Sequence, residues 1–265
     1  MPEILHKIIE SRKKSLENQV REFEKSLRSH ATNKRLPINQ HIRKNGEHVS
    51  IISEIKPSSP SLGKLRSEIK VADIAKEMEI AGVVGLSVLT EPLYFNGSFE
   101  NLKFAIDSTT LPCLMKDFVF HESQFRIAKE IGATNILLIN QLGNIEKMYD
   151  LAIQYELEPL IEVHYKEELK DIESLTEIGH KPKLIGVNNR NLNTMEIDLN
   201  TSKQLISLIK NMLRNHAFVI SESGIHSHED IKELIAHEAD AFLIGSSIMQ
   251  SPDIREKIYQ LRGLS

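Results

Sequence analysis

The stretch that decides the fold is Val49-Ser50-Ile51-Ile52-Ser53-Glu54-Ile55, the first of eight short apolar runs along the chain. Runs that are apolar almost throughout, rather than alternating with polar residues, are typical of parallel strands covered on both faces. We therefore expect each run to form a buried parallel strand. The runs cover residues 49–55, 85–89, 113–116, 135–139, 157–163, 184–187, 218–220 and 241–244.

An amphipathic segment follows each apolar run, so the chain repeats a strand-then-helix unit eight times. Eight such units in roughly 215 residues favour a closed (β/α)8 TIM barrel of the α/β class. An open doubly wound sheet is the alternative, but no G-x-G-x-x-G nucleotide fingerprint follows any run. The expected helices lie near residues 71–81, 99–107, 121–131, 144–155, 166–175, 201–211, 227–237 and 251–262.

Residues from about 2 to 29 have helical periodicity of their own. Lysine, arginine and glutamate occupy the face opposite the apolar stripe, which predicts one amphipathic helix or a pair of helices. A partner-binding coiled segment is the alternative, but the stripe does not sustain a strict heptad. We expect one domain over residues 1–265, with residues 1–47 as a helical extension packed on the barrel. The stripe consists of Ile4, Leu5, Ile8, Ile9, Leu16, Val20, Phe23 and Leu27.

The composition excludes several classes of function. Lys and Arg number 33 against 37 Asp and Glu, a formal charge of -4 that gives no basic surface for nucleic acid. The N-terminus lacks the apolar core of a signal peptide, and no apolar run approaches the ~20 residues of a membrane span. Cys113 is the single cysteine, so no intramolecular disulfide can form. We expect a cytoplasmic protein without a membrane or nucleic-acid partner.

Charged residues stand at the ends of several runs, where a barrel places its active site. Glu54 and Lys56 lie on one side of the first strand because side chains alternate along a strand. Across the barrel mouth they are expected to meet Lys116 and Glu162. Two lysines and two carboxylates in a partly desolvated mouth can serve as acids and bases with tuned pKa values. The alternative is a structural salt-bridge network at the rim.

Small residues follow the last two runs, as Ser223-Gly224-Ile225 and Gly245-Ser246-Ser247. Such residues let backbone N–H groups approach an anion, and barrels often bind phosphate after these two strands. The alternative is that they only form tight strand-to-helix turns. Two such turns in these units predict a phosphate ester as ligand.

Four other residues or pairs are candidates for a functional role, but the sequence evidence for them is weaker. His226 and His228 lack a third ligand at zinc-site spacing, so no metal site is expected. Cys113 has no evident histidine partner for nucleophilic catalysis and is expected to be buried and inert. We interpret His164 as structural or solvent-facing, and Asp117 as a support for Lys116 or for the following loop.

The residues at the run ends resemble those of the indole-3-glycerol-phosphate synthase family, and the resemblance extends along the whole chain. Seven stretches match in the order of the family: 52–61 (ISEIKPSSPS), 87–98 (SVLTEPLYFNGS), 114–118 (LMKDF), 160–164 (LIEVH), 186–192 (GVNNRNL), 221–225 (SESGI) and 242–247 (FLIGSS). No departure occurs at the polar positions carried over below.

The resemblance implies a cofactor-free carboxy-lyase of tryptophan biosynthesis. It closes the ring of 1-(o-carboxyphenylamino)-1-deoxyribulose 5-phosphate and releases carbon dioxide and water. Lys116 is then the general acid for the substrate carbonyl, and Glu162 stabilises cationic intermediates. Glu54 and Lys56 handle the substrate carboxylate and later proton transfers.

The remaining site residues are also implied by the resemblance. Asn188, Arg190 and Ser223 hold the substrate. Phosphate is held by Ser59, Gly224, Gly245 and Ser246, and the aromatic ring lies between Phe95, Leu192 and Leu243. The N-terminal helices pack over the mouth and exclude water. A monomer is expected, with weak association with other pathway enzymes left open.

Two alternatives are left, another enzyme of the same fold and pathway and a protein of a different class. Phosphoribosylanthranilate isomerase and the tryptophan synthase α subunit are phosphate-binding barrels of the same pathway, but Cys113 is misplaced for the acid–base pair of such an isomerase. A non-catalytic phosphate-binding barrel is the other alternative. The intact set of Lys116, Glu162, Glu54 and Lys56 argues against it.

Overall fold

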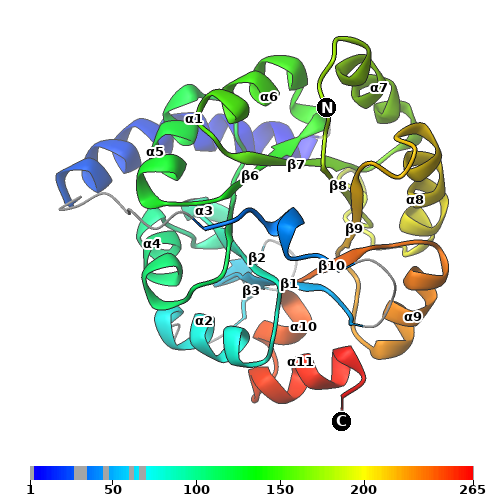
Figure 1. Ribbon diagram of the computed structural model, residues 1–265. Coiled ribbons are helices and arrows are strands. Elements are labelled where there is room, and N and C mark those ends of the chain that lie inside the picture. Colours follow the sequence, from blue (N-terminus) through cyan, green and yellow to red (C-terminus); the bar gives the residue numbers. More distant parts are fainter. Residues whose placement is uncertain (1–2, 27–34, 44–47, 60–62, 66–69, 265) are drawn as a thin grey trace.

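The computed structural model describes residues 3–26, 35–43, 48–59, 63–65 and 70–264, and these contain a closed barrel of eight parallel strands (Figure 1). Neighbouring strands follow the chain order, and the last strand pairs with the first, with Ser53 opposite Ile244. The predicted (β/α)8 barrel is confirmed. Its strands are β1 (Ile51–Ile55), β4 (Gly85–Leu89), β5 (Cys113–Lys116), β6 (Asn135–Ile139), β7 (Glu158–Val163), β8 (Leu184–Asn188), β9 (Phe218–Glu222) and β10 (Ala241–Ile244).

Eight helices surround the barrel and cover its outer face (Figure 1). Each lies in its expected segment, and the ends of strands and helices agree with the sequence prediction to within three residues. These helices are α2 (Val71–Ile80), α4 (Phe99–Ser108), α5 (Glu122–Ile131), α6 (Ile145–Gln154), α7 (Leu169–Glu177), α8 (Asn200–Met212), α9 (His228–Ala236) and α11 (Ile254–Arg262).

Several short elements lie in segments where the sequence predicted only connections. The helix α3 (Pro92–Phe95) forms because the Glu91 carboxylate accepts hydrogen bonds from the N–H groups of Leu93, Tyr94 and Phe95. Such one-turn elements are too short to give a periodic pattern. The others are α10 (Ser246–Met249), the 3-10 helices η1 (Ile38–Gln40) and η2 (Asn140–Leu142), and the hairpin of β2 (Ser58–Ser59) and β3 (Gly63–Lys64). The 3-10 helix η3 (Lys166–Glu168) instead forms the start of the segment expected to be helical over 166–175.

Side chains inside the barrel form layers of four that come from alternate strands, as is usual for this fold. One apolar layer consists of Ile52, Leu114, Leu160 and Ile220, all fully or almost fully buried. Two residues further along the same four strands, the inward-facing side chains are charged. This upper layer consists of Glu54, Lys116, Glu162 and Glu222.

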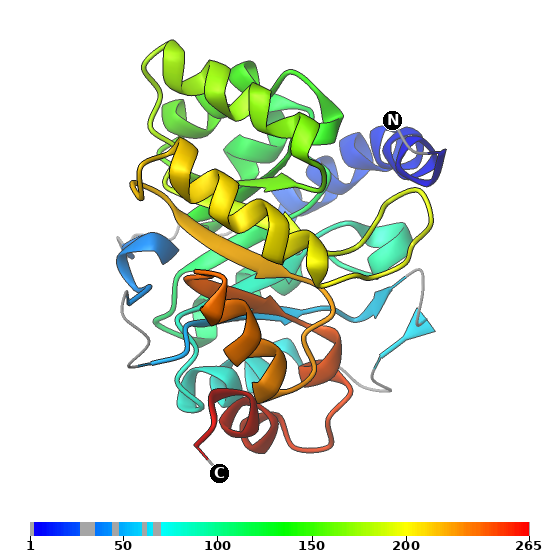
Figure 2. The same ribbon diagram turned by 90° about the vertical axis from the view of Figure 1, so that its right-hand side faces the viewer.

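The two ends of the barrel are covered by different parts of the N-terminal extension. Figure 2 shows η1 at one end and α1 (Glu3–Ser26) with the β2–β3 hairpin at the other. At the end near η1, Ile38 and Ile42 join the interior apolar cluster, and the Ile38 N–H donates to Oδ1 of Asn135 at 3.0 Å. The α1 end is the end that carries the charged layer.

A buried ion pair fastens α1 to the barrel next to Lys116. Arg12 donates from Nε and Nη2 to the two carboxylate oxygens of Asp117 at 2.9 and 2.7 Å, and both side chains are 0% exposed. Thr90 donates to the same carboxylate, and the Arg12 guanidinium lies over the ring of Phe99. Helix α1 therefore packs on the barrel as a single helix over 3–26, and residues 27–29 of the expected helix lie outside the described residues.

No helix in the described parts of the chain combines the length and the apolar character that crossing a membrane requires.

Replacing Arg12 by alanine is expected to destabilise the protein by about 3–5 kcal/mol, because the buried Asp117 carboxylate loses its charge partner. Lys13, one residue along the same helix, pairs with Glu10 on the surface. Lys13→Ala should change the free energy of unfolding by less than about 0.5 kcal/mol. Urea unfolding measures both, and similar losses in the two variants would contradict the proposed importance of the Arg12–Asp117 pair.

Candidate active site

A cavity of about 370 Å³ opens at the barrel end that α1 covers. Ile4, Leu5 and Ile8 of α1 form part of its wall, so the helix narrows the mouth of the barrel. Thirteen of the predicted site residues line this cavity. They are Glu54, Lys56, Phe95, Lys116, Glu162, Asn188, Arg190, Leu192, Ser223, Gly224, Leu243, Gly245 and Ser246.

Lys116 is the centre of the charged layer. Its Nζ lies 2.8 Å from Oε2 of Glu222 and 3.3 Å from Oε2 of Glu162. Beside them, Nζ of Lys56 lies 2.7 Å from Oε1 of Glu54. The four predicted charged residues therefore meet at the mouth, as expected, and a third carboxylate joins them.

The carboxylates determine the charge of Lys116. Burial alone would lower the pKa of Lys116, but attraction by Glu222, Glu162 and Glu54 outweighs burial and raises that pKa above its usual value. For Glu162, burial opposes ionisation, yet Lys116 and His164 hold its pKa far below the usual value. At neutral pH the cavity thus contains a protonated lysine beside an ionised glutamate.

Glu222 is the residue of this site that sequence reasoning did not select. It ends β9, is 1% exposed, and its pKa is raised to about 7, because burial and the negative charge of Glu162 outweigh the attraction of Lys116. The strand pattern contained a signal for it. Ile220 and Glu222 are two residues apart, so they must face the same interior as Leu114 and Lys116 do on β5.

Two glycines make space for the carboxylates of this layer. A Cβ atom on Gly186 of β8 would lie 2.1 Å from Oε1 of Glu222, and one on Gly245 would lie 2.4 Å from Oε1 of Glu54. Any larger residue would have to displace these side chains. The glycines therefore leave the space that the carboxylates occupy.

The loop after β8 supplies polar and apolar groups to one side of the cavity. The Arg190 N–H donates to Oδ1 of Asn188 at 3.0 Å, and the Arg190 side chain donates to the Met195 carbonyl at 3.1 Å. Leu192 lines the cavity from the same loop. Phe95 and Phe118 also line the cavity, and their ring centroids lie 6.1 Å apart, so the cavity has an aromatic wall.

The predicted phosphate residues divide into two groups. Gly224, Gly245 and Ser246 line the cavity, with Gly224 in a turn that begins at Ser223, where both residues have positive φ. Ser246 is the first residue of α10. Ser59 lies in the strand β2, and its role remains a prediction.

Most of the weaker candidates from the sequence have structural contacts, whereas His226 lines the cavity. The Cys113 thiol is buried, and burial raises its pKa to about 12, so it is not a nucleophile at neutral pH. Nδ1 of His228 lies 3.0 Å from the carbonyl oxygen of Leu261, which connects α9 to α11. Asp117 accepts a hydrogen bond from the N–H of Phe118 in the following loop, and it also pairs with Arg12 of α1, a contact that the sequence did not predict. His164 is buried, with Nε2 3.3 Å from Oε1 of Glu162.

Comparison with known proteins identifies the family. The model of the family described as indole-3-glycerol phosphate synthase matches residues 5–261. The chain belongs to this family. An indole-3-glycerol phosphate synthase of Methanocaldococcus jannaschii is 41% identical, with 96% of this chain and 97% of the relative covered. Another of Aquifex aeolicus is 37% identical, with 99% of this chain and 93% of the relative covered.

A solved structure of a different enzyme has a similar fold. Thiamine phosphate pyrophosphorylase from Pyrococcus furiosus superposes with a TM-score of 0.58 at 15% sequence identity, covering 82% of this chain and 95% of that one. At this identity the similarity concerns the barrel alone. The indole-3-glycerol phosphate synthase family membership rests on the sequence matches.

The charged layer leads to a pH prediction. One glutamate carboxyl should titrate near pH 7, being protonated below this value and ionised above it, because Glu222 is buried beside Glu162. Carbon NMR of glutamate-labelled protein measures this titration, and Glu222→Gln should remove it. A wild-type protein in which every glutamate titrates below about pH 5 would contradict the assignment.

Proposed function

We propose that this protein is an indole-3-glycerol-phosphate synthase. It would convert 1-(o-carboxyphenylamino)-1-deoxyribulose 5-phosphate into indole-3-glycerol phosphate, carbon dioxide and water. The observation that carries the proposal is the protonated Lys116 held by Glu162 and Glu222 inside a cavity with an aromatic wall. The family match over residues 5–261 supports it.

Ring closure requires an acid at the substrate carbonyl. As the aromatic carbon that carries the carboxylate attacks the carbonyl carbon, the carbonyl oxygen gains electrons and takes a proton from Nζ of Lys116. The ring is left with a positive charge, which the ionised Glu162 stabilises. An electrostatic contact of this kind is strong because the layer is almost fully shielded from water.

Loss of carbon dioxide needs no external electron acceptor. The electrons of the broken carbon–carbon bond return to the cationic ring and neutralise it. Lys56, paired with Glu54 at 2.7 Å, is the group proposed to hold the substrate carboxylate before it leaves. An apolar slot favours this step because a carboxylate loses its charge as carbon dioxide departs.

Loss of water needs an acid for the departing hydroxyl and a base for the proton released from the ring system. Glu222 is suited to proton exchange because its pKa of about 7 lies near neutral pH. Glu54 and Lys56 are the other candidates for this step. We assign Glu222 to the proton-transfer set beside Lys116.

The substrate is proposed to lie with its ends in chemically different parts of the cavity. The aromatic ring would contact Phe95, Leu192 and Leu243, and Asn188, Arg190 and Ser223 would hold the polar middle. The phosphate would be bound at Ser59, Gly224, Gly245 and Ser246, of which the last three follow the final two barrel strands, where this fold commonly binds phosphate.

The broader setting of the activity is also proposed. The protein would act in the cytoplasm as a monomer with one domain over residues 1–265, of which residues 1–47 form the extension. A formal charge of -4 supports the absence of a nucleic-acid partner. The substrate is a small sugar phosphate, and the reaction needs no cofactor.

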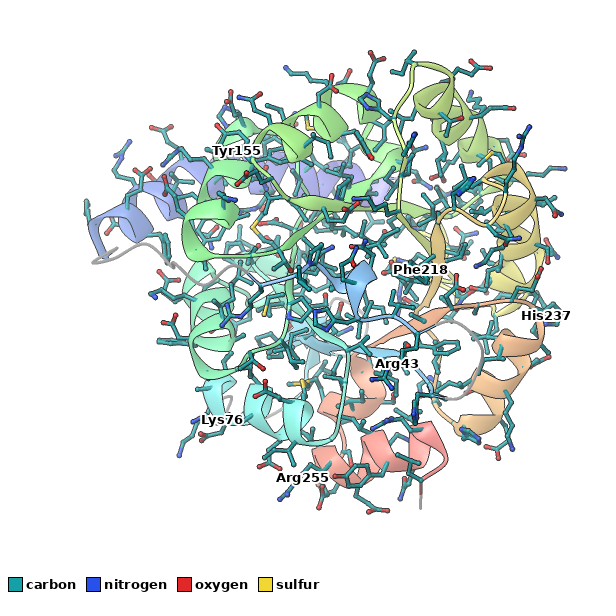
Figure 3. All side chains as sticks on the ribbon, in the orientation of Figure 1. Arg43, Lys76, Tyr155, Phe218, His237 and Arg255 are labelled. Carbon is teal, nitrogen blue, oxygen red and sulfur yellow. The ribbon has the colours of Figure 1, made fainter. Side chains whose placement is uncertain are left out.

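The reaction is tested by mixing the protein with the carboxyphenylamino deoxyribulose phosphate and following indole fluorescence. Lys116→Ala should lower kcat by about 10²- to 10⁴-fold, because it removes the general acid. Lys76→Ala is the matched control, since Lys76 projects from the outer side of α2 (Figure 3). No turnover by folded wild-type protein would refute the function, and equal turnover by Lys116→Ala would refute the proposed acid.

The phosphate site is tested by adding a negative charge to it. Ser246→Asp should raise KM for the substrate at least about tenfold, because a carboxylate would repel the phosphate. Ser174→Asp, on the exposed face of α7, should leave KM unchanged. A normal KM in Ser246→Asp would place the phosphate elsewhere in the cavity.

A further inference from the structure

His164 lies behind the charged layer and has no role in the reaction described above. It directly follows β7, and its side chain is 1% exposed. Its Nε2 lies 3.3 Å from Oε1 of Glu162, while the other oxygen of that carboxylate lies 3.3 Å from Nζ of Lys116. Glu162 is therefore placed between two basic side chains.

Three carboxylates face this imidazole from three elements: Glu162 of β7, Glu168 of η3 and Glu222 of β9. Oε1 of Glu168 accepts hydrogen bonds from the backbone N–H of His164 at 3.3 Å and from Gln141 at 3.0 Å. Its other oxygen is buried and has no hydrogen-bond partner among the described residues. Burial alone would lower the pKa of His164, but the attraction of these carboxylates outweighs burial and raises it.

The proposed reaction creates a need for a second cation beside Glu162. When Lys116 gives its proton to the substrate, Glu162 loses its nearest positive charge. A carboxylate buried without a charge partner takes up a proton, because burial disfavours the ionised form. A protonated Glu162 could no longer stabilise the cationic ring.

We propose that His164 is a positioning residue that acts through Glu162. Its imidazolium fixes the Glu162 carboxylate in the cavity and keeps it ionised while Lys116 is without its proton. This inference rests on the proposed function. The imidazole reaches the reaction only through Glu162.

The test compares kcat and KM of His164→Leu and His164→Gln with wild type between pH 5 and pH 9. Leucine removes both the hydrogen-bonding group and the charge, whereas glutamine retains an N–H donor without the charge. His237→Asn is the matched control, because His237 lies at the end of α9 on the outer side of the barrel (Figure 3). Urea unfolding of each variant shows whether the fold is retained.

At pH 6 we expect kcat of His164→Leu to fall about 10- to 100-fold with KM unchanged, because the carboxylate is misplaced and partly protonated. The deficit should shrink as the pH rises through the pKa of the wild-type imidazole, where wild type also loses this charge. His164→Gln should be less impaired, and His237→Asn unaffected. A normal kcat in His164→Leu, or a deficit that is constant with pH, would overturn the proposal.

A second measurement on the native histidine needs neither turnover nor a folded His164→Leu variant. Nitrogen NMR of histidine-labelled wild type should show the His164 ring protonated at pH 7, and Glu162→Gln should lower its pKa. A neutral ring at pH 7 in wild type would overturn the proposal. Wild type without turnover but with a charged His164 would refute the proposed function and not the charge state, so the two failures are distinguishable.

Discussion

The structure depends on the burial of one ammonium group, that of Lys116, directly above an apolar layer of the barrel interior. Beneath it lie Ile52, Leu114, Leu160 and Ile220, so no water column from below can solvate the charge. A buried ion is tolerated only when opposite charges and good geometry compensate for the lost hydration. The carboxylates of Glu162 and Glu222, at 3.3 and 2.8 Å, provide that compensation.

Other residues at the barrel mouth accommodate the charged layer or hold α1 beside it. Gly186 leaves room for Glu222, Gly245 leaves room for Glu54, and the ion pair of Asp117 with Arg12 holds α1 beside the end of β5. The helix then limits access of water to the cavity, which strengthens every charge interaction inside it. Stability and the proposed catalysis thus use the same residues. A charge network that is costly to bury is retained where proton transfer and cation stabilisation require it.

Much of the fold and of the candidate site could be predicted from the sequence, and there are physical reasons why the remaining features could not. The apolar runs and amphipathic segments gave the barrel because period and length are local properties. Glu54, Lys56, Lys116 and Glu162 could be selected because charges at the ends of buried strands are unusual. Glu222 was not selected from the stretch Ser221-Glu222-Ser223-Gly224. Its spacing of two residues from Ile220 nevertheless indicates that both side chains face the barrel interior. The contact of Arg12 with Asp117 joins residues 105 positions apart, and no local pattern encodes it.

The most direct test of the central claim is a crystal structure with the alcohol obtained by reducing the carbonyl of the proposed substrate. This compound retains the aromatic carboxylate and the phosphate but cannot undergo ring closure. We predict that Nζ of Lys116 lies within about 3 Å of the hydroxyl oxygen that replaces the carbonyl, with the phosphate beside Gly224 and Ser246 and the ring against Phe95. A compound bound in the reverse direction, or with Lys116 still paired only to Glu162 and Glu222, would contradict it.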